Sequence, residues 1–260
     1  MTQFEKAVKT IAIIIAIFVV VVIIGGIVTA VVAITTIFSS DKAEHMFVTK
    51  ANEAIESSVE LKDIDESFDA LEVEDLEVSN AIGTVTIREA DIKEIHVSGT
   101  NLNEASTIEL RGDKLWIENA AVNVELFGVK LGEKVSEEDI GIVIEIPKGY
   151  TFESVYLENA VGTVYATGIT AETIRLENGV GCMECTDIFA SETKVECGVG
   201  NVELKFKGIM NDYDMHLEPG IGSITVDGVR QSEMNHTNRE ADNEIRVDGG
   251  AGKVTIDFSE

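Results

Sequence analysis

The sequence predicts an all-β protein, a single-stranded β-solenoid (β-helix) of about 19–20 residues per coil, preceded by one N-terminal transmembrane α-helix. Three observations lead to this expectation. A short glycine-containing motif recurs between residues 80 and 256, and the residues on either side of each copy alternate between apolar and polar. In addition, a long segment near the N-terminus carries no charge.

The uncharged segment runs from Ile11 to Phe38 and comprises 28 residues, nearly all Ile, Val, Ala, Phe, Gly or Thr. As an α-helix it would be about 42 Å long, whereas a hydrocarbon core about 30 Å thick needs only about 20 residues. A cleaved signal peptide is the alternative, but its apolar region usually has only about 7–15 residues. We therefore expect an uncleaved signal-anchor helix over 11–38, with 1–10 as a short cytoplasmic tail.

The flanking charges orient this helix in the cell membrane. Lys6 and Lys9 precede it, and the acidic residue Asp41 follows it closely. Because positive charges are retained on the cytoplasmic side, the N-terminus is expected in the cytoplasm and the C-terminal domain outside it. Gly26 and Ala30 form a small-xxx-small pair of the kind that brings two membrane helices together.

The part of the chain after the helix is strongly acidic. Without Glu5, Lys6 and Lys9, the totals of 47 acidic and 20 basic residues fall to 46 and 18, a net charge of −28. Such a field repels anionic lipid headgroups and attracts cations or basic partners. It also excludes nucleic acid as a partner. The acidity does not indicate disorder, since Val, Ile and Leu are abundant and regularly placed.

Residues 39–65 contain no copy of the motif and have mild helical character. We expect them to form a stalk or cap between the membrane helix and the first coil, because the ends of a solenoid must be covered to prevent edge pairing. The acidic solenoid domain is expected over 66–260.

The repeat is the most informative feature of the sequence. We take the central glycine of each copy as its marker. The markers are Gly83, Gly162, Gly181, Gly200, Gly222 and Gly252, with Val122 in a degenerate copy. Their spacings of 39, 40, 19, 19, 22 and 30 residues indicate one coil length, two double steps and two late insertions. The insertions, 210–215 and 231–243, are expected to be polar loops.

Each copy has the same internal pattern. An aliphatic residue stands five positions before the marker, and two more stand two and four positions after it, such as Val85 and Ile87. This alternation predicts a strand, a turn and a strand with one buried face. The glycine, and the Asn often found three residues earlier, suit turn positions with positive φ. Coils of this size bury their apolar side only by stacking, and an antiparallel sandwich would not explain so constant a repeat.

Cysteines do not suggest a disulfide framework. Cys182, Cys185 and Cys197 are few and odd in number. The spacing of Cys182 and Cys185 is found in zinc and redox sites, but positions three apart in a strand point to opposite faces. We therefore expect these residues to serve packing.

Several segments resemble a known family. The stretch from Ile144 to Gly162, with its Ile-Pro-Lys-Gly-Tyr run, is similar to the DUF4097 family of adhesin-like proteins. The run from Leu71 to Ile87 and the ending from Gly252 to Phe258 are similar to it as well. The family includes LiaG-like bacterial envelope proteins, often with an N-terminal membrane segment. Over roughly 66–260, the resemblance implies a β-solenoid exposed at the bacterial cell envelope and brings no catalytic residues.

Carboxylates recur four residues before the markers. They are Glu118, Glu158, Glu177, Glu196, Glu218 and Asp248, with Ser79 in the first copy. Equivalent positions of stacked coils lie about 4.8 Å apart, so the spacing predicts a column of carboxylates along one edge. One hypothesis is that the column binds divalent cations such as Ca²⁺ or docks a basic partner surface. The simpler alternative is that the carboxylates accept turn N–H bonds or point into solvent and keep the edge soluble.

No feature selects a catalytic site. Glycoside chemistry needs two carboxylates at a defined separation in a cleft, and Trp116 is the sole tryptophan available to stack a sugar. The run from Gly249 to Val254 lacks the Ser or Thr that follows the lysine of a P-loop. We expect a non-enzymatic, membrane-anchored protein whose extracytoplasmic solenoid serves binding, adhesion or envelope sensing, with no cofactor except possible Ca²⁺. Its expected partners are a membrane protein or cell-wall material. The alternative is an accessory or regulatory subunit of a membrane signalling or envelope-stress complex.

Overall fold

The computed structural model describes residues 61–120, 125–126, 129–130, 140–232, 234–235 and 237–259. The expected cytoplasmic tail, membrane helix and most of the stalk, residues 1–60, lie outside the described residues, and so does the degenerate marker Val122. No helix in the described part of the chain is long and apolar enough to cross a membrane. Strands β7 (Glu125–Leu126) and β8 (Val129–Lys130) form a small antiparallel pair of their own.

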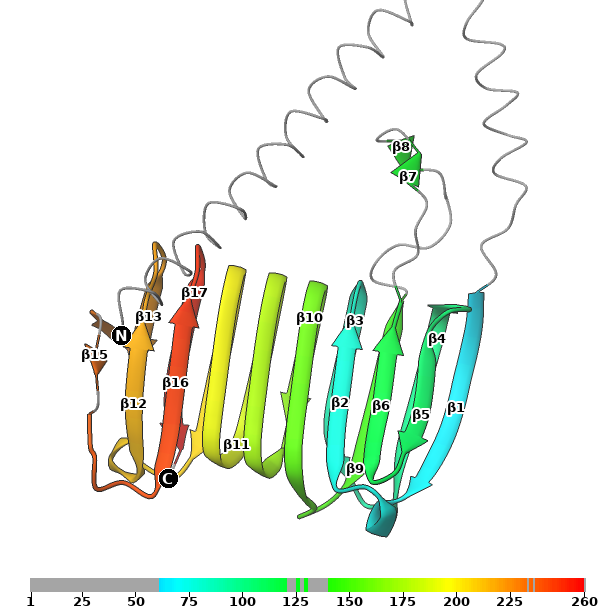
Figure 1. Ribbon diagram of the computed structural model, residues 1–260, viewed down its shortest axis with the longest axis horizontal. Helices are drawn as coiled ribbons and strands as arrows, with labels where there is room; N and C mark the ends of the chain where they lie inside the picture. The colour runs from blue at the N-terminus through cyan, green and yellow to red at the C-terminus, as the bar shows by residue number, and fades with distance from the viewer. Residues whose placement is uncertain are drawn as a thin grey trace, which may run out of the picture. The chain divides into compact units, whose positions relative to one another are not determined.

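The repeating unit is plainest in the middle of the solenoid (Figure 1). Strands β10 (Thr151–Thr167) and β11 (Thr170–Lys207) wind through successive coils, and the two pair in parallel. The pairing sets Thr151 opposite Thr170 and Thr167 opposite Thr186, an offset of 19 residues. The predicted all-β coil length is therefore confirmed here.

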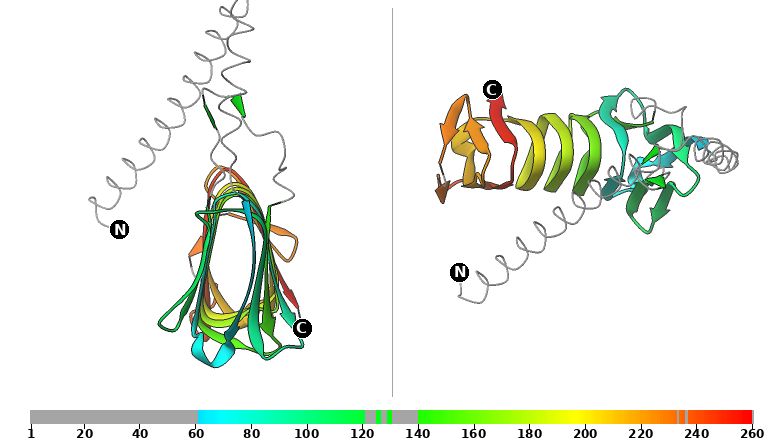
Figure 2. Two further views of the ribbon diagram at one scale, coloured as in Figure 1. Left: turned by 90° about the vertical axis from the view of Figure 1, so that its right-hand side faces the viewer. Right: turned by 90° about the horizontal axis from the view of Figure 1, so that it is seen from above.

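Each coil contributes to two walls that face each other across the core (Figure 2). The first wall holds the strand residues before the markers, and the second wall holds those after them. Beside β10, the first wall continues through β2 (Asp75–Asn80) and β6 (Lys114–Asn119), and the second through β3 (Gly83–Ala90) and β9 (Gly141–Pro147). Beside β11, the first wall continues through β16 (Asn243–Gly249) and β12 (Tyr213–Glu218), and the second through β17 (Lys253–Ser259) and β13 (Ser223–Val226). All of these pairings are parallel.

The spatial order of the coils differs from their order in the chain. The coil of Gly83 lies directly beside that of Gly162, while β6 and β9 lie on its other side. At the opposite end, the coil of Gly252 lies between those of Gly200 and Gly222. The interpretation of the long spacings as double steps is therefore wrong. Parallel backbone edges and apolar rows are nearly the same in every coil, so the repeat does not specify which coils become neighbours.

Antiparallel strands cover both ends of the stack. At one end, β4 (Glu94–Asn103) pairs with β9, β1 (Leu61–Asp69) pairs with β4, and β5 (Thr107–Arg111) pairs with β6. At the other, β14 (Val229–Gln231) pairs with β13 and β15 (Met234–Asn235) pairs with β12. The expected stalk boundary at residue 65 falls inside β1.

Short 3-10 turns form at η1 (Ala70–Glu72) and η3 (Met210–Asp212). The expected polar loop over 210–215 is thus only partly a loop, because Tyr213 and Met215 point inward from β12 and are buried. The second expected loop, 231–243, includes the end of β14 and all of β15.

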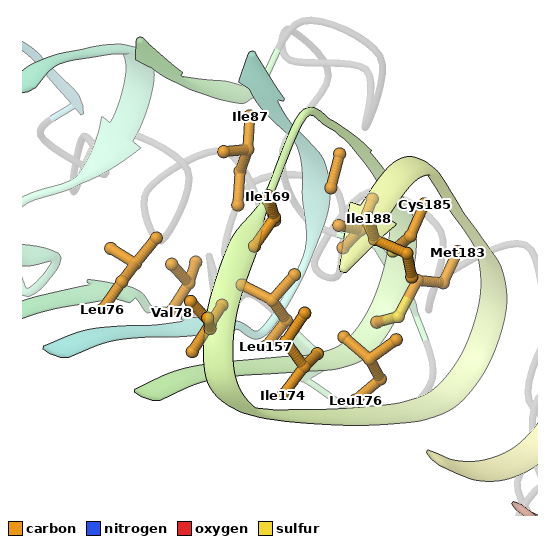
Figure 3. Close-up of a cluster of buried hydrophobic side chains, with 14 of the residues drawn as sticks. Leu76, Val78, Ile87, Leu157, Ile169, Ile174, Leu176, Met183, Cys185 and Ile188 are labelled. Carbon is orange, nitrogen blue, oxygen red and sulfur yellow. The ribbon is translucent and has the colours of Figure 1, made fainter. Parts of the chain in front are cut away.

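The core lies between the two walls and is built from the same positions of each coil (Figure 3). In one coil these are Ile174 and Leu176 from the first wall and Met183 and Cys185 from the second, each 1% exposed. The aliphatic residues predicted five positions before the markers are all buried. Full burial of such a side chain stabilises the folded state by about 1.5–3 kcal/mol, so stacking accounts for the stability of coils that are not stable singly.

A ladder of buried asparagines runs along the turns that hold the markers. Asn119 donates to Asn80 at 2.7 Å, Asn80 to Asn159 at 2.9 Å, and Asn159 to Asn178 at 2.8 Å, each from Nδ2 to Oδ1. These side chains point inward, and none of the four has positive φ. The expected role of the asparagines in left-handed turn positions is therefore wrong, because their amides satisfy buried polar groups between coils. We call the turns at 80–83, 159–162, 178–181, 197–200, 219–222 and 249–252 the marker edge.

Candidate interaction surface

The predicted carboxylates lie in one row on the outer face of the first wall. In space the row runs Glu118, Ser79, Glu158, Glu177, Glu196, Asp248 and Glu218. We call it the carboxylate row. Its order follows the interleaved coils, so the last two members are exchanged relative to the chain.

A second row, two residues before the carboxylates, supplies cations. Arg175 contacts Glu177 and lies 3.7 Å from Glu196. Lys194 Nζ lies 2.5 Å from Glu196 Oε1, and His216 Nε2 lies 3.3 Å from the carboxylate of its own coil. These groups are partly exposed to solvent, so each pair contributes at most about 1 kcal/mol. Sequence reasoning missed this row, although a basic residue two positions before a carboxylate is visible in several copies.

The ion pairs do not cancel the negative potential of the surface. Burial, together with the nearby carboxylates of Glu158 and Glu177, raises the pKa of Tyr156 to about 12. Glu158 itself accepts a hydrogen bond from the hydroxyl of Ser79 at 2.9 Å. The centre of the row is therefore a site where a further cation is attracted.

The described residues include no group of three or more His, Cys, Asp or Glu side chains arranged to hold a metal ion. A Ca²⁺ ion takes about six to eight oxygen ligands, whereas the row offers carboxylates singly and next to basic side chains. Binding of Ca²⁺ by the row remains a prediction.

The marker glycines stack into a column at the marker edge. A Cβ atom on Gly162, Gly181, Gly200, Gly222 or Gly252 would clash with the carbonyl oxygen of the marker glycine in the adjacent coil, and one on Gly83 would lie 2.6 Å from the carbonyl oxygen of Ile140. Four of them, Gly83, Gly162, Gly181 and Gly200, also have φ between 101° and 134°. The glycines are therefore required by close backbone approach, and at four positions by backbone conformation as well.

An apolar row runs beside this column. It consists of the residues directly before the markers, and in space it runs Ile82, Val161, Val180, Val199, Ala251 and Ile221. We call it the aliphatic ridge. Val161, Val180 and Val199 are 41%, 51% and 54% exposed, and Ile221 is 89% exposed. The signal was present in the sequence, as an apolar residue before every marker, but it was not used.

The cysteines divide as the strand geometry predicts. Cys182 is exposed, whereas Cys185 and Cys197 are buried. Burial raises the pKa of the Cys185 thiol to about 12, so that it stays protonated and unreactive. Burial also raises the pKa of Cys197, which is partly offset by hydrogen bonds from the Gly250 N–H and the Asn178 amide. Cys197 thus continues the asparagine ladder.

Trp116 does not offer both of its faces to a ligand. The guanidinium carbon of Arg111 lies over the ring, 4.3 Å from its centroid. This cation–π contact occupies one of the faces that a sugar ring would need.

Comparison with solved structures gives the fold a context. The chain resembles the crystal structure of a "putative cell adhesion protein" from Clostridium sporogenes, at 14% identity and a TM-score of 0.56, over 77% of this chain and 100% of that one. A "putative adhesin" from Bacteroides fragilis matches at 11% identity and a TM-score of 0.30, over 76% and 98%. No curated protein matches the chain. The family model described as Toastrack DUF4097 matches residues 73–259, which is most of the sequence. The chain therefore belongs to the Toastrack DUF4097 family.

Proposed function

We propose that the chain is a non-enzymatic protein of the bacterial cell envelope, anchored by one membrane span at 11–38, whose solenoid outside the cytoplasm binds, adheres to or senses an extended partner. The observation that carries this proposal is the repetition of outward-facing rows. Carboxylates, cations and aliphatic side chains each recur once per coil, about 4.8 Å apart. Such rows suit a long or repetitive partner better than a small substrate.

The chemistry of the rows supports binding rather than catalysis. General acid–base work on a sugar needs a pair of carboxylates in a cleft, one of them kept protonated. The carboxylates of Glu177 and Glu196 instead lie on an outer face, partly exposed and paired with Arg175 and Lys194.

The test is cross-linking in intact cells, followed by affinity purification of the tagged full-length protein. Wall or surface material that is recovered with the wild-type chain, and also when 11–38 is replaced by an unrelated membrane span, supports the binding surface. Recovery of neither wall material nor a defined protein partner would contradict it. Hydrolysis of wall polymers by the purified chain would contradict the non-enzymatic part.

A regulatory subunit of a membrane signalling or envelope-stress complex is the second candidate. The Gly26 and Ala30 pair favours it, because small residues one helical turn apart allow close helix packing in a membrane. The same cross-linking experiment separates the two. A defined integral-membrane partner that is lost on replacement of 11–38 supports the regulatory subunit.

A further inference from the structure

The aliphatic ridge places apolar side chains where turns usually carry polar ones. Gly, Asn, Asp, Ser and Pro dominate turns because of their backbone preferences. Here every described copy has Ile, Val or Ala directly before its marker, and the residue before that is Ala or Gly throughout. The ridge therefore projects from a flat border of small residues.

Packing within the solenoid explains only part of this choice. Ile82 packs against the core. By contrast, Val180 and Val199 leave about half of their surface in solvent, and Ile221 leaves nearly all of it. Threonine has the same branched shape as valine and stacks equally well in a β structure, so stacking alone does not require methyl groups. A continuous exposed apolar strip is typical of an interaction site.

The two flanks of the ridge differ in charge. On the first wall, the carboxylate row lies three residues before the ridge in each coil, and its potential is negative despite its ion pairs. On the second wall, the residues after the markers are mostly uncharged: Thr84, Thr163, Cys182, Asn201, Lys253 and Ser223. An occupant of the ridge thus meets apolar side chains in the centre and negative charge on one side.

We propose that the aliphatic ridge docks a basic amphipathic helix of a partner protein, with the apolar stripe of the helix on the ridge and its Lys and Arg side chains facing the carboxylate row. This deepens the proposed function and rests on it. The ridge spans five coil steps, or about 24 Å, which a helix of about 16 residues covers. One helical turn of about 5.4 Å differs from one coil step by about 0.6 Å, so the two remain in approximate register over this length.

Charge disfavours the other occupants. A second copy would bring two carboxylate rows together, each on a domain with a net charge of −28. An anionic membrane surface is repelled for the same reason. The chain's own residues 41–60 hold five acidic and two basic residues, so they do not complement the row.

The test uses the full-length chain in nanodiscs of neutral lipid and a labelled synthetic helix as probe. The peptide has Leu at positions i, i+3 and i+7 along one stripe and Lys along one flank, and a scrambled peptide of the same composition is the control. Binding is measured by fluorescence anisotropy at physiological and raised ionic strength. We expect the wild-type chain to bind the helical peptide, more weakly at high salt, and to discriminate against the scrambled one.

Two sets of variants locate the binding. The ridge triple variant Val161→Ser, Val180→Ser, Val199→Ser is expected to lose at least about tenfold in affinity, equivalent to about 1.4 kcal/mol. The row variant Glu158→Gln, Glu177→Gln, Glu196→Gln is expected to bind more weakly and with less salt dependence. The matched control Leu71→Ser, Ile209→Ser, Val229→Ser changes three exposed apolar residues off the ridge and should bind like wild type. Unfolding by urea verifies that each variant is folded.

Unchanged affinity of the folded ridge variant, equal binding of the scrambled peptide, or no binding by wild type would each overturn the proposal. The cross-linking experiment, repeated with the ridge variant, separates this outcome from failure of the proposed function. If the variant still recovers its envelope partner, the proposed function stands and the docking surface lies elsewhere. If even the wild-type chain recovers none, the proposed function fails, whatever the peptide does.

Discussion

Asn159 takes part in three buried hydrogen bonds of the marker edge. It accepts from Asn80, donates to Asn178 and donates to the carbonyl oxygen of Gly162 at 3.1 Å. Each of these groups is left without a partner when the side chain is removed, and a buried polar group in that state costs about 1–3 kcal/mol. The ladder therefore ties neighbouring coils together through polar contacts inside an apolar core.

The substitution Asn159→Ala should lower the free energy of unfolding by at least about 2 kcal/mol, because it leaves more than one buried group unsatisfied. Urea denaturation measures this. Asn201→Ala removes an exposed asparagine from the second wall and should change stability by less than about 0.5 kcal/mol. Equal losses for the two variants would show that the ladder adds nothing.

Thr193 carries the opposite situation. Its side chain is fully buried beside Ile245, and its hydroxyl has no hydrogen-bond partner among the described residues. Thr193→Val keeps the shape and removes the buried hydroxyl, so we expect a gain of about 1 kcal/mol in urea denaturation. Thr193→Ala serves as a control, since it creates a cavity and should destabilise. A loss of stability in the valine variant would indicate a hydrogen bond to water at this position.

At the level of the coil, sequence and structure agree on length but not on neighbours. The spacing of Gly162, Gly181 and Gly200 predicts a repeat of 19 residues, and the strand register has that offset. The same spacing predicts the carboxylate row, because side chains at equal positions of stacked coils must align. It does not predict the place of the coil at Gly252, since each coil offers an equivalent edge. The partner of each carboxylate was missed, because Arg175 also reaches into the next coil.

The coil 170–188 is equivalent to the coils on either side, so its removal should join two compatible edges. We expect the chain lacking 170–188 to fold, with a urea m-value reduced in proportion to the lost surface. Circular dichroism and urea unfolding measure both. Deletion of 179–188 alone removes one strand and its turn, which breaks the winding, and should abolish cooperative unfolding. A folded half-coil deletion would contradict the repeat as the unit of structure.

Charge acts on the molecule as a whole. The net charge of −28 on the part after the predicted membrane helix produces self-repulsion in the folded state. The local ion pairs are partly exposed and contribute little. Added salt should therefore stabilise the fold by screening the repulsion. The melting temperature should rise by a few degrees between low and high NaCl, and a fall would mean that the ion pairs outweigh the repulsion.

The insertion of the coil at Gly252 between two earlier coils also has a consequence for biosynthesis. The last part of the chain to leave the ribosome, β16 and β17, occupies an interior place in the stack. The coil made just before it has no parallel neighbour until then, so folding that proceeds from the first residue onward stalls one coil short of completion. A nonsense codon or a proteolytic cut ahead of residue 243 thus releases two coils instead of one, which leaves an incompletely translated or clipped chain open to degradation.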